Sequence, residues 1–243
     1  MIQEVTIING PFSPQYGDFS GLGVVHIRQR ESLPELLTVK LEGGNFDNAR
    51  TFVAFSPEWQ GVDSYIAYDG SYINGPFQNH GRYRRDNINA NLTKTLGPGE
   101  KLGFRFLAGS NNFFSSGQLP LDLVNIGLLD RFGYIDPSEG GRVKLGTVSA
   151  YYSRSLSSGD TLRLDGFIGR SLFDLYSNFT FYLNDPIHGD AFQQHDSRIQ
   201  EGLNVQYIHA HKLGSAPALL VQISMTTRSM LACIPVRVVF QRA

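Results

Sequence analysis

The sequence has little cysteine, little net charge and no long apolar run, and each shortage excludes a class of protein. Its single cysteine, Cys233, rules out an internal disulfide and leaves no set of thiolates for a metal site. The formal net charge of -1 predicts no polyelectrolyte partner, and no basic stripe with interleaved aromatic residues indicates nucleic-acid binding. No stretch approaches the roughly twenty apolar residues of a membrane helix.

Export signals and common catalytic motifs are missing as well. The first ten residues, MIQEVTIING, contain neither a basic region nor an apolar core of the kind found in signal peptides. Taken literally, they predict a soluble cytoplasmic protein, provided that Met1 is the true start. No P-loop, nucleophile elbow or zinc-protease motif is present, and the spacing from Gly17 to Gly23 is not the dinucleotide fingerprint.

What the sequence does contain is period-two alternation, which places successive side chains on opposite faces of a sheet. Gly, Asn, Ser, Tyr and Phe are plentiful, a composition that suits strands and turns better than helices. In LTVKLEGG, for example, Leu37, Val39 and Leu41 share one face. Apolar residues alternate with other residues in the same way in four further segments, at 86–96, 101–109, 161–169 and 203–209. We therefore predict an all-β fold.

The connections between these segments alternate in length. Beyond a first tight link at GGNFDN, short turns at 56–61, 96–100, 156–160 and 213–218 alternate with long loops near 73–81, 115–142 and 175–197. In an antiparallel meander, this alternation places the short turns at one end and the long loops at the other. Outer-membrane barrels have this polarity, with strands that are apolar toward lipid and polar toward the lumen. The segments also have about the nine to eleven residues that a tilted strand needs to cross a bilayer.

The opening stretch, VTIINGPFSPQYGDFSGLGVVHIRQRES, then carries a family resemblance. It resembles the end of the plug domain of TonB-dependent outer-membrane receptors, and LTVKLEGGNFDNARTFVAFSP resembles the first hairpin of their barrel. Glycines in this stretch permit positive φ and close backbone approach, as a chain folded back within a lumen needs. The matching plug positions are Gly10, Pro11, Tyr16, Gly17, Gly21, Gly23, Val24, Val25 and Ile27.

The resemblance implies a division of the chain. Residues 1–30 would be the C-terminal end of the plug, 31–36 a linker, and 37–223 the first strands of an antiparallel partial transmembrane β-barrel with about eight strands. Barrels with a plugged lumen have about twenty-two strands, so we expect a fragment whose signal peptide, TonB-contacting box and remaining plug precede Met1. The tail 224–243 changes composition, which indicates a frameshift or a truncated gene, or else a genuine methionine-rich tail.

The resemblance also implies a function for the complete protein. Receptors of this kind import a scarce nutrient, such as a siderophore, cobalamin or a glycan, across the outer membrane of Gram-negative bacteria. The expected partners are outer-membrane lipid, the TonB energy-coupling complex and a small-molecule or glycan ligand. No bond of the substrate need be broken, so we expect neither an enzyme nor a cofactor, and no metal site.

Two groups of polar residues are candidates for ligand contact. His209 and His211 lie on one face of a strand, where they could grip a metal or simply sit at the membrane interface. The segment NDPIHGDAFQQHD falls in a predicted extracellular loop and could capture a metal chelate, although exposed loops are rich in such residues anyway. Its candidate residues are Asp185, His188, Asp190, His195 and Asp196.

Two other interpretations remain open from the residues alone. A small eight-stranded barrel could close on itself, which would require the strand at Leu37 to pair with the strand near Leu203. A secreted soluble β-protein could instead bind carbohydrate through a face rich in Tyr and Asn. Both barrel interpretations turn the aliphatic rows toward lipid, whereas a soluble protein would bury them in a dry interior between two layers.

Overall fold

The computed structural model is built almost entirely of β-strands. It describes residues 1–243 apart from 11–21, 158, 188, 214–215, 234–236 and 239–243, and its side chains as far as His209. The one helix in the described part is α1 (Leu121–Asn125). The strands are β1 (Ile2–Asn9), β2 (Gly23–Gln29), β3 (Leu37–Gly44), β4 (Asn48–Phe55), β5 (Val62–Ile73), β6 (Tyr83–Gly97), β7 (Glu100–Phe114), β8 (Gly140–Ser155), β9 (Thr161–Ser177), β10 (Phe192–Leu213), β11 (Ala216–Cys233) and β12 (Arg237–Val238).

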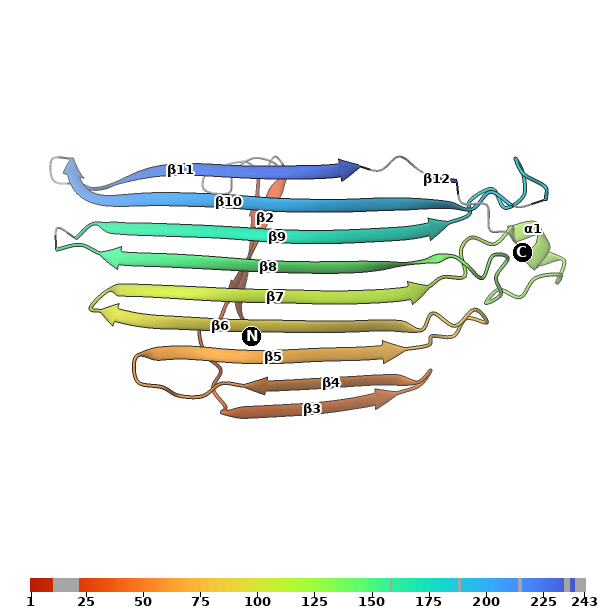
Figure 1. Ribbon diagram of the computed structural model, residues 1–243, viewed down its shortest axis with the longest axis horizontal. Coiled ribbons are helices and arrows are strands. Elements are labelled where there is room, and N and C mark those ends of the chain that lie inside the picture. Colours follow the sequence, from red (N-terminus) through yellow and green to blue (C-terminus); the bar gives the residue numbers. More distant parts are fainter. Residues whose placement is uncertain (11–21, 158, 188, 214–215, 234–236, 239–243) are drawn as a thin grey trace.

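The strands form two antiparallel sheets. β1 and β2 pair as a hairpin, and β3 to β11 pair in sequence order as one meander, with β12 added beside β10 (Figure 1). The predicted all-β fold and antiparallel meander are therefore confirmed. The sheet is open, with β3 and β11 at its edges, so it has the organisation of a portion of barrel wall.

The predicted polarity of the connections is confirmed too. The short connections from β4 to β5, from β6 to β7 and from β8 to β9 lie at one end of the sheet, while the long connections from β5 to β6, from β7 to β8 and from β9 to β10 lie at the other (Figure 1). The tight β3–β4 link is closed by Phe46 and Asp47, whose φ angles are 61° and 56°. Such left-handed residues match the twist of a short hairpin.

The two faces of the large sheet are inverted relative to a soluble protein. The apolar rows are exposed: Leu41 is 74% and Ile168 54% accessible, whereas Asn91 and Thr93 on the opposite face are 3% and 0% accessible. Exposed apolar surface costs about 25 cal/mol per Å² in water, so a face of this kind is stable only against an apolar phase or another apolar surface. The aliphatic rows are not enclosed between two layers.

The N-terminal hairpin lies against the polar face of the large sheet. In Figure 1, β2 crosses the long strands at a steep angle. Met1 and Leu33 pack against the small buried cluster of Ala54, Tyr65 and Ala67 on β4 and β5. The backbone N–H of Leu33 donates to Ser56 Oγ at 2.9 Å. The hairpin and the segment after it therefore cover the face that carries the polar rows.

Strand pairing contradicts the small closed barrel. That fold needs the strand at Leu37 to pair with the strand near Leu203. In the described part of the chain, β3 pairs only with β4, while β10 pairs with β9, β11 and β12.

The predicted atypical tail begins within a strand. β11 continues without a break past Ile223, the last residue before that tail, and pairs with β10 over its full length. The division of the chain into domains stays a prediction. None of the described helical residues forms a segment long and apolar enough to traverse a bilayer.

Aromatic side chains on the polar face cover glycines on neighbouring strands. Gly103 on β7 pairs with Tyr151 on β8, and a Cβ added at Gly103 would overlap the tyrosine ring. The ring position is further held by a short hydrogen bond between the hydroxyls of Tyr151 and Thr93, and the Arg105 guanidinium lies 4.5 Å from its centroid. The absence of a side chain at Gly103 therefore sets the packing of the inner face.

We predict that Gly103→Ala lowers the free energy of unfolding by about 1–3 kcal/mol, because the added methyl group displaces the Tyr151 ring. Urea unfolding in detergent, followed by the fluorescence of the single tryptophan, Trp59, measures the change. Gly146→Ala is the matched control, because a Cβ there meets only the Leu107 carbonyl oxygen, at 4.0 Å. Equal effects of the two substitutions would contradict the packing role of Gly103.

Candidate ligand-facing site at the long-loop end

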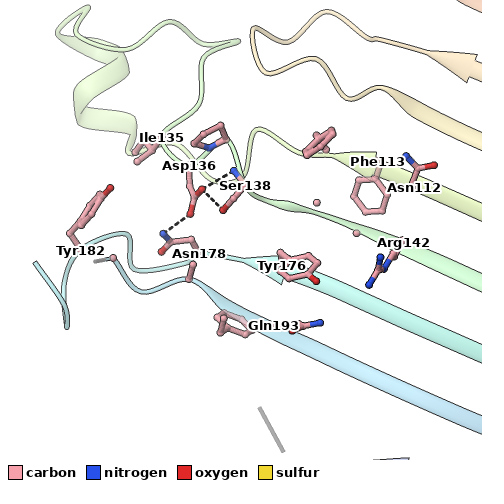
Figure 2. A pocket seen from close by; sticks show the side chains of 17 residues that line it. Asn112, Phe113, Ile135, Asp136, Ser138, Arg142, Tyr176, Asn178, Tyr182 and Gln193 are labelled. Carbon is pink, nitrogen blue, oxygen red and sulfur yellow. Dashed lines mark hydrogen bonds between the residues drawn. The ribbon is translucent and has the colours of Figure 1, made fainter. Parts of the chain in front are cut away.

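A cavity of about 540 Å³ lies at the long-loop end of the sheet. The ends of β7 to β10 form its base, and the loops 115–139 and 178–191 form its walls (Figure 2). Its lining combines aromatic rings with polar groups, including Phe113, Tyr176, Tyr182, Asn112, Arg142 and Gln193. A concave site of this size and composition could hold a small molecule.

Asp136 joins the two loops in the wall of this cavity. Its Oδ1 accepts hydrogen bonds from the Ser138 backbone N–H at 2.8 Å and the Ser138 hydroxyl at 2.6 Å. Its Oδ2 accepts from Asn178 Nδ2 at 3.0 Å, across to the other loop (Figure 2). Burial opposes ionisation of Asp136, but the hydrogen bonds from Ser138 and Asn178 prevail and lower its pKa.

Glu139 lies beside this group and is the more deeply buried acid, with 6% of its surface accessible. Burial and the nearby negative charge of Asp136 raise the pKa of Glu139. Its carboxylate abuts the backbone of Gly117, where any side chain would overlap it. Gly117 has a φ of 63°, so its lack of a side chain serves both the left-handed backbone and the space for Glu139.

A second polar group surrounds Asp174 near the end of β9. Asp174 accepts hydrogen bonds from Arg142 Nε at 2.8 Å and Gln193 Nε2 at 2.9 Å, and it contacts His195 Nδ1 at 2.6 Å. The register pairs Arg142 and His195 directly with Asp174, on the face that also carries Ile168. Because Arg142 and Gln193 line the cavity, these contacts fix the positions of two side chains at its base.

Asp190 organises the loop 178–191 from within. Its carboxylate accepts hydrogen bonds from Thr180 Oγ1 at 2.6 Å and from the backbone N–H groups of Asn184 and Asp185 at 3.0 and 2.8 Å. These bonds, led by the one from Thr180, lower the pKa of Asp190 to about 2. Asp190 therefore stabilises the conformation of this loop through hydrogen bonds within it, a role that was not predicted from the sequence.

The structure corrects part of the predicted ligand loop. That loop was expected to extend to Ser197, but β10 begins at Phe192, so His195 and Asp196 lie in a strand. They also point to opposite faces: His195 contacts Asp174, while Asp196 accepts from Arg198 Nη2 at 2.7 Å. This end of β10 is polar on both faces, and without apolar alternation its sequence resembles that of a loop.

The remaining candidates are distributed as follows. Asp185 and Asp190 lie in the loop as predicted, and His188 lies outside the described residues. Among the residues that the structure describes, no group of three or more His, Cys, Asp or Glu side chains could hold a metal ion. His209 contacts Asp160 Oδ1 at 2.6 Å near a short turn, and the side chain of His211 lies outside the described part. Ligand capture by the predicted loop stays a prediction.

The plug-motif residues are described only in part. Gly10 and Gly23 lie where β1 ends and β2 begins; Gly23 pairs with Asn9, and the Gly10 N–H donates to the Leu22 carbonyl at 3.4 Å. A Cβ at Gly23 would lie 2.8 Å from the Ile8 carbonyl oxygen, so glycine permits the close pairing. Four further motif residues fall outside the described part of the chain, namely Pro11, Tyr16, Gly17 and Gly21.

Sequence reasoning missed the contacts that attach the hairpin to the wall. Lys101 Nζ donates to Glu31 Oε2 at 2.6 Å, and Asn91 Nδ2 donates to the Glu31 backbone carbonyl at 2.7 Å. Tyr65 donates to Asn89 Oδ1 at 2.8 Å beside them. The alternating asparagines of β6 predicted which face of the strand is polar. Nothing in the sequence near Glu31 indicated that this residue contacts that face.

The fold is similar to that of a solved import receptor. The open form of the ferric-catecholate import receptor Fiu from Escherichia coli K12 matches with a TM-score of 0.73 and 12% sequence identity. The match covers 100% of this chain and 42% of that chain, so this chain spans less than half the length of the receptor. No family model and no curated protein matches the sequence.

We predict that the order of the loop 178–191 depends on the charge of Asp190. Because the pKa of this group is lowered from 3.8 to about 2, its stabilisation is complete above pH 4 and is lost as the pH falls through 2. Hydrogen exchange of the Asn184 and Asp185 amides, corrected for intrinsic rates, should accelerate over that interval. In Asp190→Asn these amides should exchange fast at every pH, and pH-independent protection in the parent protein would contradict the assignment.

Proposed function

We propose that this chain forms part of an outer-membrane import receptor of the TonB-dependent kind. In this proposal β3 to β11 are a portion of the barrel wall, and β1 and β2 are the end of the plug. The observation that carries the proposal is the inversion of the sheet, with apolar rows exposed outward and polar rows facing the hairpin. The similarity to a ferric-catecholate import receptor supports the same general kind of function.

The outward face has the features expected of a wall in contact with lipid. On β9, Leu162, Leu164 and Ile168 form an apolar row that ends at Arg170 toward the long loops. The exposed side chain of Lys144 lies diagonally opposite Arg170 on β8. Strands β8 and β9 have 16 and 17 residues, more than the roughly nine to eleven that cross a bilayer. In this proposal the excess projects beyond the outer leaflet and supports the cavity.

The linker would anchor the plug end to the wall. An exposed ion pair such as Lys101–Glu31 contributes only about 0.2–1 kcal/mol, so it serves to position the linker. Asn91 is 3% accessible and holds the Glu31 carbonyl, a bond whose loss would leave a buried group unpaired. When the energy-coupling complex pulls on the plug, this attachment would keep the end of the hairpin against the barrel.

The cavity at the long-loop end would then face the incoming nutrient. Its aromatic rings and polar groups suit a ligand with both apolar and hydrogen-bonding surface. Siderophores, cobalamin and glycans all meet this description. The receptor would bind one of them from outside and pass it through the lumen without chemical change.

A pair of adjacent substitutions on β10 tests the orientation of the wall. Leu203 is 54% accessible on the outward face, whereas Asn204 faces the lumen and pairs with Asp165. Leu203→Arg should cost about 2–4 kcal/mol at the membrane midplane and reduce insertion into the outer membrane. Asn204→Arg should be tolerated, because Asp165 lies directly opposite. Heat-modifiable migration of outer-membrane fractions on gels measures insertion, and equal tolerance of both variants would contradict the orientation.

The transport role is tested in the native host. Disruption of the coding region should abolish energy-dependent uptake of one radiolabelled nutrient from a panel of ferric siderophores, cobalamin and oligosaccharides. Uptake of a small sugar that diffuses through porins is the control and should not change. Unchanged uptake of every member of the panel would contradict an import function while leaving the membrane orientation untouched.

A further inference from the structure

Three buried oxygen atoms in the two loops that border the cavity have no hydrogen-bond partner within the described structure. They are Ser116 Oγ, Glu139 Oε1 and Asn178 Oδ1. The residues Glu139 and Asn178 are only 6% and 3% accessible. Buried polar atoms are almost always hydrogen-bonded, and buried charges are paired or coordinate metals. These oxygen atoms therefore call for a partner, which can be a hydrogen-bond donor or a cation.

Glu139 and Asn178 form one cluster together with Asp136, and Ser116 lies near it in the chain. Asn178 joins its members, because its side-chain Nδ2 donates to Asp136 Oδ2 at 3.0 Å and its backbone lies within hydrogen-bonding reach of the Glu139 carboxylate. The Glu139 carboxylate in turn abuts Gly117, the neighbour of Ser116 in the chain. Figure 2 shows Asp136, Ser138 and Asn178 meeting where the two long loops approach each other.

The cluster contains two carboxyl groups and no cationic side chain. Asp136 and Glu139 are close enough for the charge of one to disfavour ionisation of the other. Among the described residues, neither forms an ion pair with a Lys or Arg side chain. Arg142 also lines the cavity, but Asp174 already engages it at 2.8 Å. A divalent cation would satisfy both carboxylates and the unpartnered oxygen atoms at once.

We propose that Asp136, Glu139 and Asn178 bind a Ca²⁺ ion that ties the loop 115–139 to the loop 178–191. The available ligands are all oxygen atoms, from two carboxylates and an amide, which is the kind of donor set that Ca²⁺ prefers. Zn²⁺ favours nitrogen and sulfur ligands, and the cluster contains no His or Cys. Ligands on loops also suit the flexible geometry of Ca²⁺ better than the strict octahedron of Mg²⁺.

The bound ion would determine the shape of the cavity. Asp136 and Asn178 both line it, and they come from opposite walls. Linking them through a cation would hold the walls at a fixed separation and lower the entropy lost when a ligand binds. The proposed Ca²⁺ site is inferred from the oxygen atoms of the two loops, so it does not depend on which nutrient the protein imports.

Titration of the full chain in detergent micelles tests the proposal. Ca²⁺ should bind with saturation in isothermal calorimetry, and Tb³⁺ should luminesce on excitation of tyrosine, because Tyr176 and Tyr182 line the same cavity. Added Ca²⁺ should quench the Tb³⁺ signal by competition, whereas equal Mg²⁺ should not. Absence of saturable Ca²⁺ binding up to millimolar concentration, or equal competition by Mg²⁺, would overturn the proposal.

Two substitutions separate ion binding from a structural role. Glu139→Gln keeps the shape of the side chain and should weaken Ca²⁺ binding by about tenfold or more, while Asp122→Asn on α1 removes an exposed carboxylate from the same loop and should change nothing. When a chelator removes Ca²⁺, the melting temperature of Glu139→Gln should equal or exceed that of the parent, because the substitution replaces a buried carboxyl group that then has no cation beside it. Parent-like Ca²⁺ affinity in Glu139→Gln would overturn the assignment, and Asp136→Asn provides the same test if the first variant fails to fold.

Discussion

Alternation of side chains across a single sheet is the constraint on which the rest of this structure depends. Because the period is two, a slip of one residue in any pairing would move every outward aliphatic side chain to the polar face. The register from β5 to β10 shows no such slip along the spans that carry the apolar rows. One geometric rule therefore separates the exposed apolar rows from the polar rows beneath the hairpin.

The elements that follow from local pattern were predictable from the sequence. The asparagines at 87, 89 and 91 alternate with aliphatic residues, and this alternation alone identified β6 and its two faces. The unequal spacing of Gly- and Pro-containing turns fixed which connections are long. The open edges of the sheet were not predictable in the same way, because strand pairing at an edge depends on chain that lies far away in sequence.

The contacts within the candidate site were not predictable, because they join residues distant in sequence. Asp136 and Asn178 come from different loops, and nothing near either residue in the sequence indicates the other. His195 and Asp196 were predicted to lie in a loop because the strand ends near the long loops lack the apolar alternation by which strands are recognised. The same segments support the cavity, so the region of greatest functional interest carries the weakest sequence signal.

Spin labelling along β9 tests the central claim most directly. Single cysteines at positions 162 to 168, introduced in a Cys233→Ser background and labelled in lipid bilayers, report contact with lipid through collisions with oxygen and contact with water through collisions with a nickel chelate. The account predicts high oxygen accessibility at the even positions, which include Leu162, Leu164 and Ile168, and low oxygen accessibility at the odd positions, which include Arg163 and Asp165. Nickel accessibility at every position, or oxygen accessibility at the odd positions, would contradict it.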